Sequence, residues 1–495
     1  MITYGPWRRL VAVGCAAAAG ALLLSSCSTT RPHVTVAKPP AAGVAGGPAG
    51  PGVTGVAAVP GPRQTTKALA GGSSSGPVAG GAPIVGGTQA QPSGGGPGSP
   101  AVQAAGGDVK IGFHVIKPAN YSQAGGKAGS TGDAKASVAA VVKWVNAHGG
   151  IAGRRVVSVV YETDATTAQY TSEAQAMCTA LTEDAHVLAA VSVASSIADP
   201  SGCFAAHKTP FISQERWTYT PQQLKSLGNY LYLLRAPQAD HWGSAYVDGL
   251  ASQGFFAHTG KLGVITYDTG EYSYLVDRVI APRLAAHGVQ IVDQAKAGAF
   301  ENAGSLGAIG TVMGNAILRF RSEGITKVMF AEAGGVLPFM FMPEAEGQGY
   351  RPRYGLQSLS DPSFLASGQV PAAQLVNSVG IGWEPVDDVP QQEIQTSLPA
   401  SSQCIKVARD AGTDLELGYC DAIFFIKAAL DRALTVTAEG LQRSVESLGT
   451  SYASALTFST RFGPDRHDGP NAFRALVYTL SCGCYRYSGP SQAMP

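Results

Sequence analysis

Residues 144–164 read WVNAHGGIAGRRVVSVVYETD, and this stretch joins two kinds of periodicity. Before it, valines recur at the three- and four-residue spacing of an amphipathic helix, whereas RVVSVVY (155–161) is a β-branched run typical of a buried strand. Gly149 and Gly150 suit a helix C-cap with positive φ, and Gly153 suits the turn that follows. The stretch therefore predicts a tight helix-to-strand joint of the kind that parallel α/β sheets use.

Strand and helix patterns alternate on both sides of this joint. Extended or strand patterns lie at 109–116, 155–161, 186–193, 209–213, 261–268, 289–297, 327–333, 350–357 and 378–385. Helical patterns lie at 133–147, 167–183, 199–207, 271–287, 305–322, 338–348 and 418–434. Two rounds of alternation predict an α/β fold with two doubly wound parallel-sheet lobes. Ligands bind beyond the carboxyl ends of the strands in such sheets, and two lobes can close over a ligand by hinge motion.

The composition excludes some partners and divides the chain. Of 495 residues, 35 are basic and 34 acidic, so the overall charge favours neither nucleic acid nor an anionic surface as a partner. Only 14% of residues are charged, and glycine and proline, 62 and 31 in the whole chain, are enriched in residues 28–107. Residues 28–107 have no periodic apolar face, which predicts a disordered tether between the N-terminus and a folded region.

Residues 1–27 have the features of an export signal. Two arginines precede the apolar run 10–24, which is too short to span a bilayer, and the run ends in Leu-Ser-Ser-Cys. This ending resembles the lipobox of bacterial lipoproteins, which implies lipidation of Cys27. An ordinary cleaved signal with an unrelated cysteine is the alternative. An exported location permits disulfides among the six cysteines of 108–495, although the sequence does not fix their pairing.

Several blocks together resemble one known family. They are VKIGFHVIKPANY, VKWVNAHGGIAGRRVVSVVYETDA, KTPFISQ, YLYLLRAPQADHWGSAYVDGLA, KLGVITYDTGEYSYLVD and GYCDAIFFIKAALDRAL, which run in order through 108–487. They are similar to type I periplasmic binding proteins of the leucine/branched-chain amino-acid-binding subfamily, which serve ABC importers. The N-x-x-GGI-x-GR joint is the most specific of these motifs, and in this reading its glycines are architectural.

The resemblance implies three hinge crossings between the lobes, near residues 235–238, 382–385 and 464–469. Lobe one is then expected at 108–235 plus 383–464, and lobe two at 236–382 plus 465–487. A tail at 488–495 completes the expected organisation, after the signal peptide and the tether.

The resemblance also places ligand contacts on loops that follow strands. The expected ligand-binding residues are Ser195, Ser196, Ser213, Glu215 and Trp217 in lobe one, and Tyr272, Glu332 and Gln357 in lobe two. Ser195 and Ser196 have a second reading as caps of the helix near Asp199. Hydroxyls near a helix N-terminus suit a carboxylate or another polar head.

Three departures from the family pattern bear on the ligand. The loop after TPFIS holds Gln-Glu-Arg-Trp in place of small residues, and the loop after KVMFAEA holds Glu332 and two glycines. The acidic residue that receives a ligand ammonium corresponds to Gln357, which is neutral and provides no charge-assisted bond. A branched-chain amino acid is therefore a poorer expectation than a more polar or amide-like ligand.

The expected function is a lipid-anchored extracytoplasmic binding protein that delivers a small polar solute to an ABC permease and ATPase. A receptor-like sensor of the same fold with a separate signalling partner is the alternative. An enzyme is less expected because G-x-S-x-G, H-E-x-x-H and P-loop motifs are missing from the expected folded region, 108–495. Neither a cofactor nor a metal is expected, since no Cys/His group has zinc-site spacing.

Overall fold

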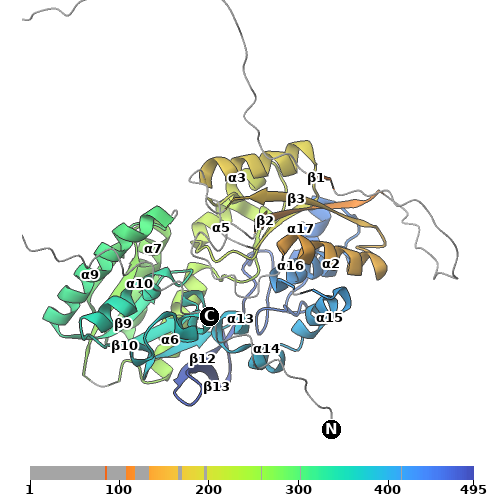
Figure 1. The fold of residues 1–495 in the computed structure, drawn as a ribbon. Coiled ribbons are helices and arrows are strands. Elements are labelled where there is room, and N and C mark those ends of the chain that lie inside the picture. The colour runs from red at the N-terminus through yellow and green to blue at the C-terminus, as the bar shows by residue number, and fades with distance from the viewer. Residues whose placement is uncertain are drawn as a thin grey trace, which may run out of the picture. The chain divides into compact units, whose positions relative to one another are not determined.

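The computed structural model describes residues 84–85, 107–117, 133–164, 170–193, 198–257, 259–300, 303–413 and 415–495. The expected signal peptide and Cys27 lie outside these residues. Two mainly parallel sheets with helices organise the described chain, as the alternating pattern predicts (Figure 1). We call the half around the first sheet lobe one and the half around the second sheet lobe two.

The first sheet has six described strands, and β2 to β6 are parallel. In spatial order they are β1 (Ile84–Val85), β3 (Val156–Thr163), β2 (Val109–Ile116), β4 (Ala189–Ser192), β5 (Phe211–Ser213) and β6 (Leu231–Leu233). β1 pairs antiparallel with β3, so two residues of the expected tether belong to this sheet.

The second sheet has seven strands within the described residues. In spatial order they are β13 (Cys484–Ala493), β12 (Ala472–Thr479), β11 (Val379–Gly382), β10 (Arg353–Gln357), β9 (Ile325–Ala331), β7 (Lys261–Tyr267) and β8 (Ile291–Ala297). β7 to β11 are parallel, and the hairpin of β12 and β13 is antiparallel. Residues 488–493, expected to be a tail, lie in β13, because they continue the antiparallel pairing with β12 across a bulge between Phe473 and Ala475.

Helices cover both faces of the first sheet. They are α2 (Ala134–Ala147), α3 (Tyr170–Thr179), η1 (Ala180–Asp184), α4 (Ser201–Ala206), α5 (Pro221–Leu227), η2 (Gly228–Tyr230), α15 (Ser401–Ala411), α16 (Leu417–Leu430) and α17 (Ala438–Glu446). One apolar core joins the sheet to α2, α15, α16 and α17, and a second core joins the other face to α3, η1, α4 and α5. α2 and α16, far apart in sequence, lie side by side (Figure 1), with the Trp144 and Phe424 rings in edge contact.

The second lobe has one continuous core. Its helices are α6 (Ala239–Ser252), α7 (Gly270–Tyr274), η3 (Leu275–Ile280), α8 (Ala281–Ala286), η4 (Ala303–Ser305), α9 (Leu306–Glu323), α10 (Val336–Gly347), η5 (Ser358–Ser360), α11 (Pro362–Phe364), η6 (Leu365–Gln369) and α12 (Ala372–Leu375). α13 (Pro385–Asp388) and α14 (Gln391–Ser397) connect β11 to α15. The chain thus passes between the lobes after β6, after β11 and before β12.

The glycine joint has the predicted geometry. Gly149, Gly150 and Gly153 all have positive φ, of 92°, 68° and 73°. A Cβ on Gly150 would lie 1.9 Å from the carbonyl oxygen of Arg154, so no other residue fits there. The joint is structural: α2 ends, the chain turns, and β3 begins at Val156.

Three disulfides join the six described cysteines: Cys178–Cys203, Cys404–Cys420 and Cys482–Cys484. The first links α3 to α4, the second links α15 to α16, and the third lies at the turn between β12 and β13. The sequence had left these pairings open.

The Cys178–Cys203 bond is expected to contribute substantially to stability. It closes a loop with a sequence separation of 25, so replacing both cysteines by alanine should lower the free energy of unfolding by about 3 kcal/mol through the freedom gained by the unfolded chain. Urea unfolding measures this change. Alanine at Cys482 and Cys484 is the control, because their separation of 2 closes almost no loop. Equal losses in the two double variants would contradict the explanation.

Candidate functional site

A buried polar chain lies at the carboxyl ends of the lobe-one strands. His114 of β2 contacts Ser192 Oγ through Nδ1 and Thr163 Oγ1 through Nε2, both at 2.8 Å. The Ser192 hydroxyl in turn donates to Glu215 Oε1 at 2.5 Å. Burial lowers the pKa of His114 to about 4, so the imidazole is neutral near pH 7. These hydrogen bonds therefore link Glu215, an expected ligand residue, to three strands of the sheet.

Polar side chains at the end of β5 and in the loop that follows fix the conformation of this loop. Ser213 is fully buried, and its Oγ accepts the N–H of Glu215 at 3.1 Å. Gln214 is also buried and donates through Nε2 to Asp421 at 3.0 Å. Trp217 is partly buried and packs against the second apolar core of lobe one. This loop has a defined conformation fixed by contacts inside lobe one.

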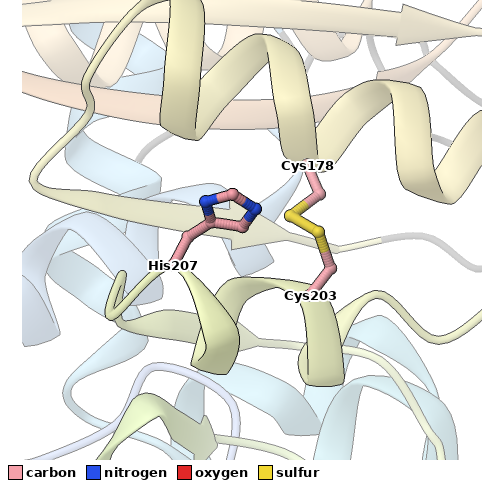
Figure 2. A group of neighbouring side chains, drawn as sticks. All are labelled: Cys178, Cys203 and His207. Atoms are coloured by element: carbon pink, nitrogen blue, oxygen red, sulfur yellow. A yellow bond between two sulfur atoms is a disulfide. The ribbon is translucent and has the colours of Figure 1, made fainter.

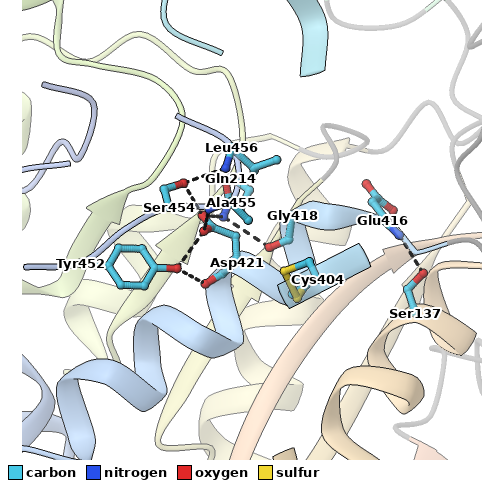
Figure 3. The surroundings of a disulfide bond; sticks show 11 residues. Ser137, Gln214, Cys404, Glu416, Gly418, Asp421, Tyr452, Ser454, Ala455 and Leu456 are labelled. Carbon is cyan, nitrogen blue, oxygen red and sulfur yellow. Dashed lines mark hydrogen bonds between the residues drawn. A yellow bond between two sulfur atoms is a disulfide. The ribbon is translucent and has the colours of Figure 1, made fainter. Parts of the chain in front are cut away.

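Asp421 of α16 is the centre of that anchoring (Figure 3). Besides Gln214, its carboxylate accepts from the Tyr452 hydroxyl at 2.8 Å, the Ser454 hydroxyl at 3.1 Å and the Ala455 N–H at 2.7 Å. Burial raises the pKa of Asp421, whereas these donors oppose that shift. The sequence analysis missed Asp421, and only its position within a largely apolar helix signalled it.

In lobe two the expected residues also follow strands. Tyr272 is in α7, directly after β7, and Glu332 follows β9. Gln357 ends β10, and its Nε2 donates to the Glu332 carbonyl at 2.9 Å while its Oε1 accepts the Leu359 N–H at 2.6 Å. The structure brings Glu332 and Gln357 together, and it uses both amide atoms of Gln357 to hold the neighbouring loops.

Glu332 is a buried acid with unused hydrogen-bonding capacity. Its side chain is fully buried, and Oε2 accepts the Gly335 N–H at 3.0 Å. Oε1 accepts no hydrogen bond from the described part of the chain. Burial raises the pKa of Glu332 to about 8, although Ser360, the Gly335 N–H and Arg216 act in the opposite direction. The carboxyl group is therefore largely protonated near neutral pH.

This pKa predicts a pH-dependent stability. The ordinary pKa of 4.5 applies to Glu332 in the unfolded chain, so between pH 4.5 and about 8 the folded state binds more protons. Stability must fall as the pH rises through that window. Glu332→Gln removes the effect. The free energy of unfolding of this variant should therefore gain about 1 kcal/mol over that of the wild type for each pH unit in the window. Thermal unfolding across the window measures the gain, and Glu344→Gln, on the exposed face of α10, is the control. A gain that does not change with pH would contradict the assignment.

Two contacts join the candidate residues of the two lobes. The Thr218 hydroxyl, in the loop after β5, donates to Tyr272 Oη at 3.4 Å. Arg216 in the same loop donates through Nη1 to Asp361 Oδ2 in lobe two, also at 3.4 Å. The loop that carries Ser213, Glu215 and Trp217 thus contacts lobe two at both Tyr272 and Asp361.

A partly buried ionic group surrounds Arg216, and Glu384 is its one fully buried member. It contains two arginines and three acids: Arg216, Arg235, Asp361, Glu384 and Asp387. Arg235, at the first crossing, bonds to Glu384 and Asp387 at the second. Burial acts to raise the pKa of Asp387, but Arg216 and Arg235 outweigh it, and the pKa is lowered. For Glu384 the effect of burial outweighs that of Arg235, and the pKa is raised.

The sequence analysis missed this group. Arg235 lies 149 residues from Glu384, so no local pattern signals their contact. Trp383 belongs to the same crossing: it is fully buried, and its indole N–H donates to the Arg235 carbonyl at 2.9 Å. That contact gives Trp383 a structural role at the hinge.

Ser195 and Ser196 lie outside the described residues, so their expected ligand role stays a prediction.

One group of described residues has the side chains of a possible metal site. Cys178, Cys203 and His207 lie close together (Figure 2), but the two cysteines form a disulfide, whose sulfurs are not the thiolates that bind metals. Within the described chain, no helix combines the length and apolar character needed to cross a membrane.

Comparison with known proteins identifies the chain. A sequence profile described as "Periplasmic binding protein" matches residues 108–477. The chain belongs to the periplasmic binding protein family. A search of curated proteins gave no match.

Solved structures share the fold of this family member at low sequence identity. An ABC transporter substrate-binding protein from Desulfitobacterium hafniense in complex with Leu is 15% identical, with a TM-score of 0.53, covering 77% of this chain and all of that one. A fatty acid ABC transporter substrate-binding protein from Thermomonospora curvata is 15% identical, with a TM-score of 0.56 and coverages of 78% and 92%. A solute-binding protein from Rhodopseudomonas palustris in complex with 3,4-dihydroxybenzoic acid is 12% identical, with a TM-score of 0.56 and coverages of 78% and 98%.

Proposed function

We propose that this protein is the solute-binding component of an ABC importer and binds a small polar ligand between its two lobes. The profile match over 108–477 carries this proposal. The site chemistry supports it, because polar side chains gather at the carboxyl ends of both parallel sheets, where ligands bind in folds of this type. In this proposal the protein captures and releases its ligand unchanged, without catalysis.

The ligand class follows from the polar groups at the two loops. Glu215 and Glu332 place carboxyl groups on either side, and Glu332 Oε1 is a buried polar atom without a partner among the described residues. Because Oε2 accepts the Gly335 N–H, the proton of the neutral carboxyl group lies on Oε1, which can donate to an acceptor of the ligand. An amino acid, an amide or a related solute fits, because each offers an oxygen acceptor as well as N–H or O–H donors. The different ligands named for the fold neighbours agree with a site whose loops, rather than its fold, select the solute.

The remaining features complete the proposal. Cys27 would carry the lipid anchor at the outer face of the cell membrane, and residues 28–107 would separate it from the lobes. Lobe one would comprise 108–235 and 383–464, and lobe two 236–382 with the C-terminal strands. The closed pair of lobes would then be the surface that a permease recognises.

A panel of solutes tests the binding function. Leucine, acetamide, decanoate, 3,4-dihydroxybenzoate and glucose are added separately to the full chain, and melting temperature is followed. At least one class should raise it, and calorimetry should then give one site per chain. The absence of any shift across a wider panel of amino acids, amides, organic acids and sugars would contradict the proposal.

Tyr272→Phe tests the location of that site. This variant removes only the hydroxyl that contacts Thr218, so affinity for the solute that binds should fall about tenfold, with little change in stability. Tyr274→Phe, two residues further along the same helix, is the matched control. Equal affinities in the two variants would place the ligand elsewhere.

A further inference from the structure

A cavity lies in lobe one, away from the candidate ligand site. It has a volume of about 390 Å³ and is bordered by the amino-terminal ends of β2 and β4, the turn before β5 and the start of α17. The residues Ser192, Ser213 and Glu215 lie at the opposite, carboxyl ends of these parallel strands. The cavity is therefore separate from the site proposed for the transported solute.

Its lining is strongly basic. Lys110, Arg154 and Lys208 line it together with His186, and Asp108 is the one acidic residue among the lining side chains. No described residue forms an ion pair with Arg154 or Lys208. Lys110 donates to the Ala185 carbonyl at 3.0 Å, which leaves two of its three N–H donors for another partner.

The nearby acids do not cancel this charge. Asp108 Oδ2 lies 3.8 Å from Nη1 of Arg155, a residue that is not part of the cavity lining. Glu439, in the first turn of α17, has a lowered pKa because of hydrogen bonds to its own backbone and Thr437, and because of Arg443 and Lys208. Asp108 is thus paired with Arg155, and Glu439 interacts with both Arg443 and Lys208, so the three lining cations still outnumber the nearby acids.

The backbone at the rim is also unusual. His186 and Lys208 adopt left-handed conformations, with φ of 51° and 54°, which non-glycine residues rarely take. Both residues stand in tight turns that border the cavity, and glycine would take these conformations at less cost.

We infer that this cavity binds a phosphate group. Three cations on different elements can contact several oxygens of one tetrahedral oxyanion, with the Arg154 guanidinium offering a planar pair of donors. The same chemistry is presented by a free phosphate or pyrophosphate and by the headgroup of an anionic lipid. The headgroup source agrees with the position of Asp108, which lies at the end of the segment leading back to the expected anchor at Cys27.

Two binding measurements test the inference and separate the two sources. The full chain carries Cys27→Ser, so that a lipid anchor cannot attach it to vesicles. Calorimetry with pyrophosphate and inorganic phosphate tests the free anions. Co-sedimentation with phosphatidylglycerol vesicles, compared with phosphatidylcholine vesicles, tests the headgroup.

The double variant Arg154→Gln/Lys208→Gln should weaken binding at least about tenfold, since each removed cation contributes a charge-assisted bond. Lys143→Gln/Lys225→Gln removes two exposed positive charges outside the cavity and should leave binding unchanged. Unaltered melting curves show that both double variants are folded. If Arg154→Gln/Lys208→Gln weakens binding of the free anions, the ligand is a soluble phosphate. If it weakens binding to the phosphatidylglycerol vesicles, the ligand is a lipid headgroup. The inference is overturned if neither probe binds, or if the two double variants bind alike.

Discussion

Arg235→Met should lower the free energy of unfolding by about 3–5 kcal/mol, because it leaves Glu384 and part of Asp387 buried without a counter-charge. The Arg235 side chain is 12% exposed and that of Glu384 is fully buried, so water cannot replace the lost partner. Urea unfolding measures the loss. The Trp383 indole keeps its bond, since it contacts the backbone carbonyl of Arg235.

Two further variants show whether the uncompensated charge is the cause. Arg235→Met/Glu384→Leu removes both partners and should recover much of the loss, because Arg216 still neutralises Asp387. Arg351→Met breaks an exposed pair with Glu346 and should cost less than about 1 kcal/mol. If Arg235→Met costs no more than Arg351→Met, the ionic group does not stabilise the hinge.

Asp421→Ala should cost a similar amount, about 4 kcal/mol, for a different reason. It leaves the buried Ser454 hydroxyl and Ala455 N–H without an acceptor, and each such donor costs on the order of 1–3 kcal/mol before the structure relaxes. Gln214 and Tyr452 each lose one of two acceptors and keep the carbonyls of Gly418 and residue 421. Chemical denaturation measures the loss. Asp410→Ala, which breaks an exposed pair with Lys406 on α15, is the control and should change stability little.

The same variant should also weaken solute binding. Gln214 lies between Ser213 and Glu215, so releasing it from Asp421 loosens the loop that carries the lobe-one ligand residues. Affinity should therefore fall under conditions in which the variant is still fully folded. Unchanged affinity in the folded variant would mean that Asp421 stabilises lobe one without positioning the site.

Local patterns predicted the architecture well. VKIGFHVI forms β2 as expected, because a continuous apolar run suits a strand buried on both faces. The glycine joint was also predicted, since the left-handed backbone leaves few alternatives to glycine. The strand 484–493 was missed: its later residues are exposed and polar, and only pairing with β12 makes them a strand.

The candidate site could be predicted only in part. Positions after strands follow from the topology, and the family resemblance selected Ser213, Glu215, Tyr272, Glu332 and Gln357 among them as expected ligand residues. Their contacts could not, because they depend on residues far away in the chain. Gln357 shows the difference: its residue type raised a question about ligand charge, whereas the structure uses its amide to hold the Glu332 and Leu359 loops.

Hydrogen–deuterium exchange of the full chain, with and without the solute that most raises its melting temperature, tests the central claim most directly. A ligand held between the lobes should slow exchange in two separate segments, the loop after β5 at 213–219 and the lobe-two loops at 332–335 and 358–361. Protection confined to one lobe, or found only outside these loops, would contradict binding between the carboxyl ends of the two sheets.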